Sequence, residues 1–233
     1  ALEANTIGDQ NTAVGTFALN LNTTGEYSVA VGYEALKAQT TATNNVAVGW
    51  QAGVATTDGA SNTFLGQYSG AANTTGASNT FVGALSGDAN TTADNNTAVG
   101  YSALTTSTTG ASNVAVGKGA LFTNNAANNI GIGYHAMYSN TTGTDGVGIG
   151  YAALDANTTG IRNVAVGKDA LGANIDASYN VALGFEALGA NTDASNNTAV
   201  GYQSLSANTT ATYNTAVGAS SLDANSTGAY NTA

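Results

Sequence analysis

The chain repeats one short pattern, of which Asn163-Val164-Ala165-Val166-Gly167 is a copy. The glycine of this pattern recurs thirteen times, and every interval is 17 residues except one of 16. Such regular spacing indicates a repeat protein, in which each repeat forms one structural unit and packs against its neighbours. The glycines are Gly15, Gly32, Gly49, Gly66, Gly83, Gly100, Gly117, Gly133, Gly150, Gly167, Gly184, Gly201 and Gly218.

The residues around this glycine predict an all-β fold. With the glycine as position 0, position −1 is Val, Leu or Ile in every copy, and the β-branched run before the glycine predicts a strand. The residue types in segments such as Tyr151–Leu154 favour helix as much as strand; we assign them to a second strand, and Asn-Thr-Thr-Gly to a turn. The prediction is a parallel β-solenoid, or β-roll, with one 17-residue coil per repeat and about thirteen rungs. Residues 1–233 then form a single uninterrupted array, which we expect to be a segment of a longer fibre.

The composition excludes several classes of protein. Only 8% of residues are charged, against roughly 25% in typical domains, and Pro and Cys are absent. Without cysteine there is no disulfide framework and no thiolate metal site. A net charge of −10 with four basic residues speaks against nucleic-acid binding, and no apolar run is long enough to insert into a membrane.

Stacking of identical residues explains which residue types recur. Asn fills position −4 in eleven copies and position +7 in ten, so we expect two ladders of hydrogen-bonded amides. Positions −1, −2 and +4 should be buried, and positions +2 and +5 exposed. Phe64 and Phe81 at −2 accompany Gly70 and Gly87 at +4, which indicates that these two positions share one packing layer.

Two local irregularities lead to separate expectations. Gly53 at +4 has an alanine as its −2 partner, and we expect Trp50 to fill that space. The one shortened repeat should lose its residue in the turn at 125–128 and keep its strand register.

The apolar residues on both faces of the strand predict that copies of the chain assemble with one another. Its positions −1 and −2 point to opposite faces and are both apolar, and strands of this kind are buried on both sides. A thin coil has one interior, so we expect the second face to meet another copy of the chain, most simply in a homotrimer. Replacing Ala165 by Glu is expected to block that assembly.

The NTAVG boxes resemble the head repeats of YadA-like trimeric autotransporter adhesins, and NTAVGYxALxxNTTG is similar to repeats of phage tail fibres. The resemblance implies a parallel β-roll, a homotrimer and an extracellular place on a virion or cell surface. The expected function is the structural shaft of a fibre that positions an attachment tip, and the tip would meet a glycan or receptor. The alternative is an adhesin whose own repeats bind the host or a glycan.

No residues are expected to carry catalysis, a cofactor or a metal, so we do not expect an enzyme. His135 is the only histidine and should face solvent, which excludes a Ser-His-Asp triad. Asp88, Asp155 and Asp223 share position +5 but lie several coils apart. Their carboxylates are therefore too far from one another to act as a catalytic pair on one bond.

Two columns, each a repeat position followed through successive coils, are candidates for surface contact. Position +1 is aromatic in several coils and is a candidate for sugar stacking, although such a ladder also stabilises a sheet. Threonine pairs at +8 and +9 form regular arrays of hydroxyls, which suggest ice binding as a less favoured alternative function. The candidate aromatic contacts are Tyr33, Trp50, Tyr101, Tyr134, Tyr151 and Tyr202, with Phe185 in the same column.

Overall fold

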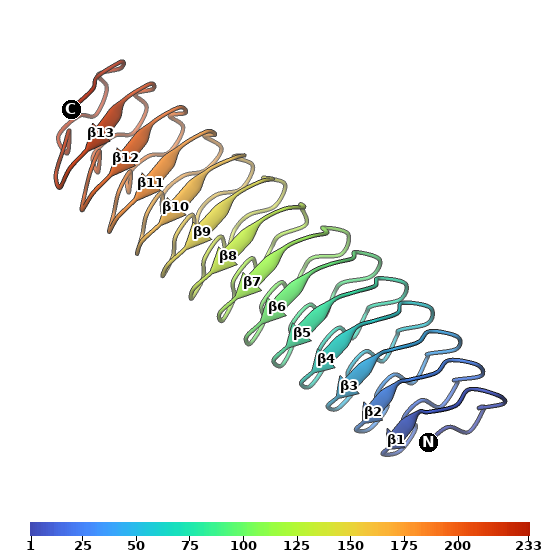
Figure 1. The fold of residues 1–233 in the computed structure, drawn as a ribbon. Coiled ribbons are helices and arrows are strands. Elements are labelled where there is room, and N and C mark those ends of the chain that lie inside the picture. The colour runs from blue at the N-terminus through green and yellow to red at the C-terminus, as the bar shows by residue number, and fades with distance from the viewer. The chain divides into compact units, whose positions relative to one another are not determined.

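The computed structural model describes all 233 residues and contains thirteen short strands and no helix (Figure 1). The chain forms two compact units, unit 1 over Ala1–Val116 and unit 2 over Gly117–Ala233. Unit 1 contains β1 (Thr12–Val14), β2 (Val29–Val31), β3 (Val46–Val48), β4 (Thr63–Leu65), β5 (Thr80–Val82), β6 (Thr97–Val99) and β7 (Val114–Val116). Unit 2 contains β8 (Ile130–Ile132), β9 (Val147–Ile149), β10 (Val164–Val166), β11 (Val181–Leu183), β12 (Thr198–Val200) and β13 (Thr215–Val217).

Within each unit, every strand pairs in parallel with the strand of the next coil. Equal repeat positions lie opposite one another, as Ala165 lies opposite Ala182 and Val166 opposite Leu183. Each coil therefore returns to its starting register after one repeat. The predicted all-β parallel solenoid is confirmed.

The strand has an inner and an outer face. Ala165 at −2 points into the coil and is fully buried, whereas Val166 at −1 is 36% exposed. Position −1 is half-buried or exposed in every coil, and Val164 at −3 is half-buried beside it. The expectation that −1 is buried is therefore wrong for a single chain, because alternate residues of a strand point to opposite faces and only one face meets the interior.

The second segment of the coil is a tight turn and not the strand that we expected. Ala152 and Leu154 both have left-handed backbone conformations, with φ values of 50° and 54°, and the residues at +2 and +4 do so in every coil. This alternation rules out an extended strand. Its amides nevertheless bind neighbouring coils, since Leu154 N donates to Ala170 O at 3.0 Å and Asp169 N donates to Tyr151 O at 2.9 Å.

The interior is one layer of small and medium side chains, in which volumes are exchanged between −2 and +4. A Cβ on Gly87 would lie 2.5 Å from Phe81 Cε2, so the ring occupies the space of the missing leucine. The Phe64 ring fills the place beside Gly70 and also the one beside Gly53. The expected shared layer is confirmed, but Trp50 does not fill the gap at Gly53, because its side chain lies outside and is 42% exposed.

The predicted ladder of paired amides is present at +7, whereas the asparagines at −4 bind the backbone of the next coil. At +7, Asn157 Nδ2 donates to Asn140 Oδ1 at 2.8 Å, and Asn174 Nδ2 donates to Asn157 Oδ1 at 2.7 Å. At −4, Asn180 N donates to Asn163 Oδ1 at 3.0 Å, and Asn163 Nδ2 donates to a carbonyl of the next coil. These amides are buried and each is used as donor and acceptor, so they satisfy the polar backbone inside the coil.

The shortened coil confirms the predicted place of the deletion. Only residues 125–128 separate Asn124 at +7 from Asn129 at −4, where other coils have five residues. Asn124 still joins its ladder, because Asn140 Nδ2 donates to its Oδ1 at 2.6 Å. Strand β8 pairs with β9 in the same register as the other strands.

Candidate functional site

The aromatic column at +1 lies outside the coil, directly after the strand. In unit 2, Tyr134 and Tyr151 stack with ring centroids 5.3 Å apart and planes at 11°, and Phe185 and Tyr202 stack at 5.4 Å and 9°. Lys168 stands where a ring is missing, with its Nζ 5.7 Å from the Tyr151 centroid and 5.4 Å from that of Phe185. The faces of these rings therefore meet each other or a cation and turn their edges to solvent, which is the arrangement of a stabilising ladder.

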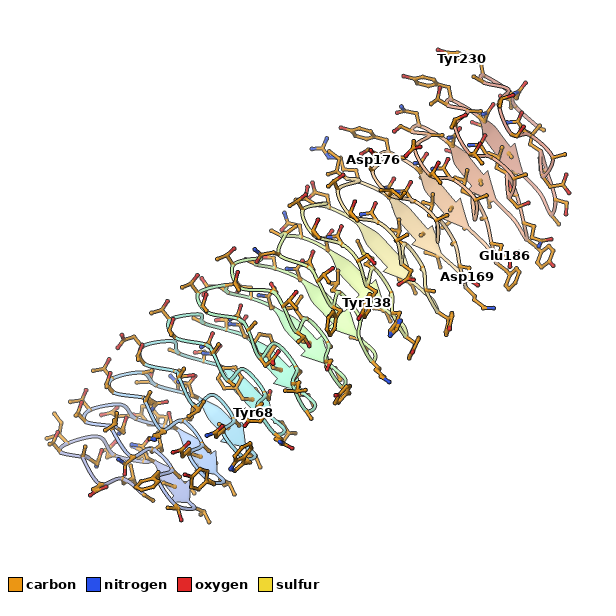
Figure 2. The ribbon with its side chains drawn as sticks, turned by 180° about the vertical axis from the view of Figure 1, so that it is seen from behind. Tyr68, Tyr138, Asp169, Asp176, Glu186 and Tyr230 are labelled. Carbon is orange, nitrogen blue, oxygen red and sulfur yellow. The ribbon has the colours of Figure 1, made fainter.

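The aromatic side chains of unit 1 are arranged differently. Tyr33 and Trp50 are 6.4 Å apart with planes at 21°, and Trp50 meets Tyr68 at 4.6 Å and 73°. Phe17 meets Tyr33 edge to face at 6.3 Å. We call these four residues the Trp50 cluster; Tyr68 is labelled in Figure 2. Tyr68 and Phe17 come from position +2, so this contact could not be found by following column +1 alone.

A polar network borders the Trp50 cluster. Lys37 Nζ donates to Glu34 Oε1 at 2.7 Å, and Gln51 Nε2 donates to Glu34 Oε2 at 2.6 Å. The Lys37 contact, followed by that of Gln51, lowers the pKa of Glu34, and the same ion pair raises the pKa of Lys37. Glu34 is only 8% exposed, which contradicts the expectation that +2 faces solvent.

Positions +2 and +5 are in fact half-buried in most coils, because the tight turn brings them side by side. In unit 2 they line a groove of about 430 Å³, where Gly172 and Gly189 replace larger +5 residues. Burial raises the pKa of the Asp155 carboxyl in this groove. Figure 2 shows Asp169 and Glu186 at this edge of the unit and Asp176 at the opposite edge. The groove is lined by Ala152, Asp155, Asp169, Gly172, Ala173, Glu186, Gly189, Ala190 and Ser206.

Two of the residues considered for catalysis in the sequence, His135 and Asp155, lie near enough for their charges to interact. His135 is half-buried, against expectation, and stacks on Tyr134 with ring centroids 3.9 Å apart. Asp88 and Asp223, which share position +5 with Asp155, lie outside the groove. No three His, Cys, Asp or Glu side chains form a group that could hold a metal ion, and no helix has the length and hydropathy of a membrane span.

The threonines at +8 are used inside the array. Thr74 Oγ1 donates to Thr91 O at 3.0 Å, and Thr141 Oγ1 donates to Thr158 O at 2.9 Å. Further +8 threonines repeat this bond, while those at +9 are exposed. These +8 hydroxyls therefore donate to backbone carbonyls of the next coil and do not form a free array for ice, which weakens the ice-binding alternative.

No family model matches the chain, and no curated protein or solved structure is significantly similar to it. The resemblance to adhesin heads and phage fibres rests on the repeat motif.

Proposed function

We propose that the chain is the structural shaft of an extracellular fibre on a virion or cell, built from identical copies and carrying an attachment tip. The support comes from the outer face of the strands. In both units, positions −3 and −1 present only Thr, Val, Ile and Leu, with no charged residue. An exposed, regular band of aliphatic side chains and threonines without charges is an interaction surface.

A second copy of the chain fits this band better than an unrelated partner does. Adjacent strands lie about 4.8 Å apart, so the band repeats its side chains at that interval. Another solenoid with the same pitch can match it coil by coil. Three bands facing a common axis bury all of this surface and give the trimer that the repeat motif implies.

The hydrogen bonding suits a load-bearing spacer. Coils bind one another through their strands and turn amides and, in most coils, through asparagines at −4 and +7, as in Val164 N to Asn180 O at 2.8 Å and Asn174 Nδ2 to Asn157 Oδ1 at 2.7 Å. No particular side chain is needed at the exposed positions for these bonds to form. The array therefore gains length without needing a site on each coil.

The oligomeric state tests the proposal. Light scattering of the full chain should give a trimer, and Val166→Glu should give monomers with unchanged far-ultraviolet circular dichroism, because it places like charges on the outer band. Thr159→Glu, at an exposed +9 position, is the matched control and should remain trimeric. Ala165→Glu is unsuitable, because Ala165 is fully buried within its own coil and the variant should unfold. A wild-type monomer with full β content would overturn the assembly. Immunogold labelling confined to the cell interior would overturn the fibre.

A further inference from the structure

We propose that the Trp50 cluster binds a single neutral pyranose ring of a surface glycan, with the Trp50 indole as its stacking platform. This inference rests on the proposed function, because a fibre that projects from a surface meets the glycans of its target. It assigns sugar binding to the Trp50 cluster alone, whereas the repeat pattern makes every aromatic residue at +1 a candidate.

The first step is the contrast between the two aromatic arrangements. In unit 2 the rings are stacked about 5.4 Å apart within 11° of parallel, or separated by Lys168, so their faces are covered. Beside Trp50 the column is interrupted, since Gln67 and Ala84 hold +1 in the next two coils. The ring that meets the indole from the next coil is Tyr68, at 4.6 Å and 73°, so no ring lies parallel to the indole on that side, and Trp50 is 42% exposed.

The second step is the polar groups around the indole. Gln67 is exposed and its side-chain amide makes no hydrogen bond within the chain. Gln51 uses its Nε2 on Glu34 and keeps its Oε1 as an acceptor. A pyranose places its C–H face on an aromatic ring and its hydroxyls at the rim, and sites for such ligands combine an apolar surface with a few polar groups. Gln67 and Gln51 supply a donor and acceptors at that rim.

The third step is charge. The only cation beside the cluster is Lys37, and it is already paired with Glu34 at 2.7 Å. The chain carries a net charge of −10. A sialic acid or sulfated sugar would find no free counter-charge, so the site favours neutral sugars.

The chain contains its own probe, because Trp50 is its only tryptophan. The full chain is titrated with maltotriose, mannotriose and N-acetyllactosamine, and with sialylated N-acetyllactosamine for comparison. At least one neutral sugar should change the tryptophan emission saturably, and the sialylated form should bind more weakly than its neutral parent. Saturation-transfer NMR on the same samples provides a readout that does not need the indole.

The variants locate the site. Trp50→Ala should lose binding by saturation transfer, Trp50→Phe should retain part of it, and Gln67→Ala should weaken it roughly tenfold. Tyr202→Ala, in the stacked ladder of unit 2, is the matched control and should bind as the wild type does. Circular dichroism checks that each variant is folded, and Trp50→Phe keeps the test informative if Trp50→Ala is not.

Three results would overturn the inference: no saturation by any neutral sugar at millimolar concentration, equal loss in Tyr202→Ala, or tighter binding of the sialylated form. Light scattering separates this inference from the proposed function. A monomeric chain that still binds N-acetyllactosamine through Trp50 would contradict the fibre and support the site. A trimer that binds no sugar would support the fibre and contradict the sugar site.

Discussion

Gln39 and Ser28 together fill a space that two asparagines fill elsewhere, and Gln39 Nε2 donates to Ser28 Oγ at 3.1 Å. Gln39 at +7 is one methylene longer than the asparagine of other coils, and Ser28 at −4 is shorter. Asn45 Nδ2 also donates to Gln39 Oε1 at 3.0 Å. The two departures from the repeat are therefore one exchange of volume and hydrogen bonds.

This exchange predicts coupling between the two positions. Ser28→Asn should crowd Gln39, and Gln39→Asn should lose its bonds to Ser28 and Asn45, each lowering the free energy of unfolding by about 1–3 kcal/mol. The double variant restores the common pair and should be more stable than the sum predicts, with a coupling of about 0.5–3 kcal/mol. Urea unfolding of the four proteins measures this, and simple additivity would contradict it.

Phe81 and Gly87 predict a second compensated pair in the apolar layer. Phe81→Ala should leave a cavity and cost about 3–5 kcal/mol. Gly87→Leu alone should drive the new side chain into the Phe81 ring and be similarly harmful. Together they recreate the alanine and leucine of other coils and should recover most of the loss in thermal unfolding. A double variant worse than either single one would refute the shared layer.

The asparagine ladder predicts sensitivity to the amide and not only to side-chain size. Asn157→Ala should cost about 1–3 kcal/mol, because it leaves the amides of Asn140 and Asn174 short of partners. Asn157→Asp keeps the shape but removes the donor and buries a charge, so we expect a larger loss near neutral pH. Chemical denaturation measures both, with Thr159→Ala at an exposed position as control. Equal stability of the aspartate variant and the wild type would count against the ladder.

Asp155 predicts a specific pH dependence. Burial raises its pKa above the ordinary value of 3.8, with His135 acting in the opposite direction and Asp169 in the same direction. Above pH 3.8 the folded chain therefore binds more protons at this group than the unfolded chain, and its contribution to stability falls as pH rises through the raised pKa. Asp155→Asn should unfold at a higher temperature than the wild type at pH 7. The difference between the two should shrink on acidification toward pH 4, and a constant difference would contradict the assignment.

The repeat predicted contacts well wherever one residue meets its own counterpart. Because all coils but one have the same length, residues at the same repeat position in successive coils are neighbours in space. Asn157 therefore lies against Asn140 and Asn174, and the sequence alone predicts these contacts. The left-handed Ala152 and Leu154 were missed, because neither residue type favours that conformation and only the stacked coils stabilise it. Phe64 beside Gly53 was missed for a related reason, since the ring reaches into the preceding coil.

The candidate site could be predicted only in part. Column +1 pointed to Tyr33 and Trp50, which are 41% and 42% exposed. Whether a ring exposes its face or its edge depends on side-chain rotamers and on contacts with neighbours such as Lys168. The sequence of a repeat position does not give this orientation. The contribution of Tyr68 from position +2 depends on the turn geometry, which was assigned to a strand.

The amide ladder at +7 has a direction, and this bears on how the gene can change. Where neighbouring coils both carry asparagine at +7, the side-chain amide of one donates to the oxygen of the preceding one, as Asn174 does to Asn157. A coil inserted in frame finds a donor waiting on one side and an acceptor on the other. Duplication or loss of a block of seventeen codons by unequal recombination, within a run of coils that carry asparagine at +7, therefore leaves the new junction chemically equivalent to the one it replaces. Array length can therefore change by whole repeats without leaving an amide at the new junction unpaired.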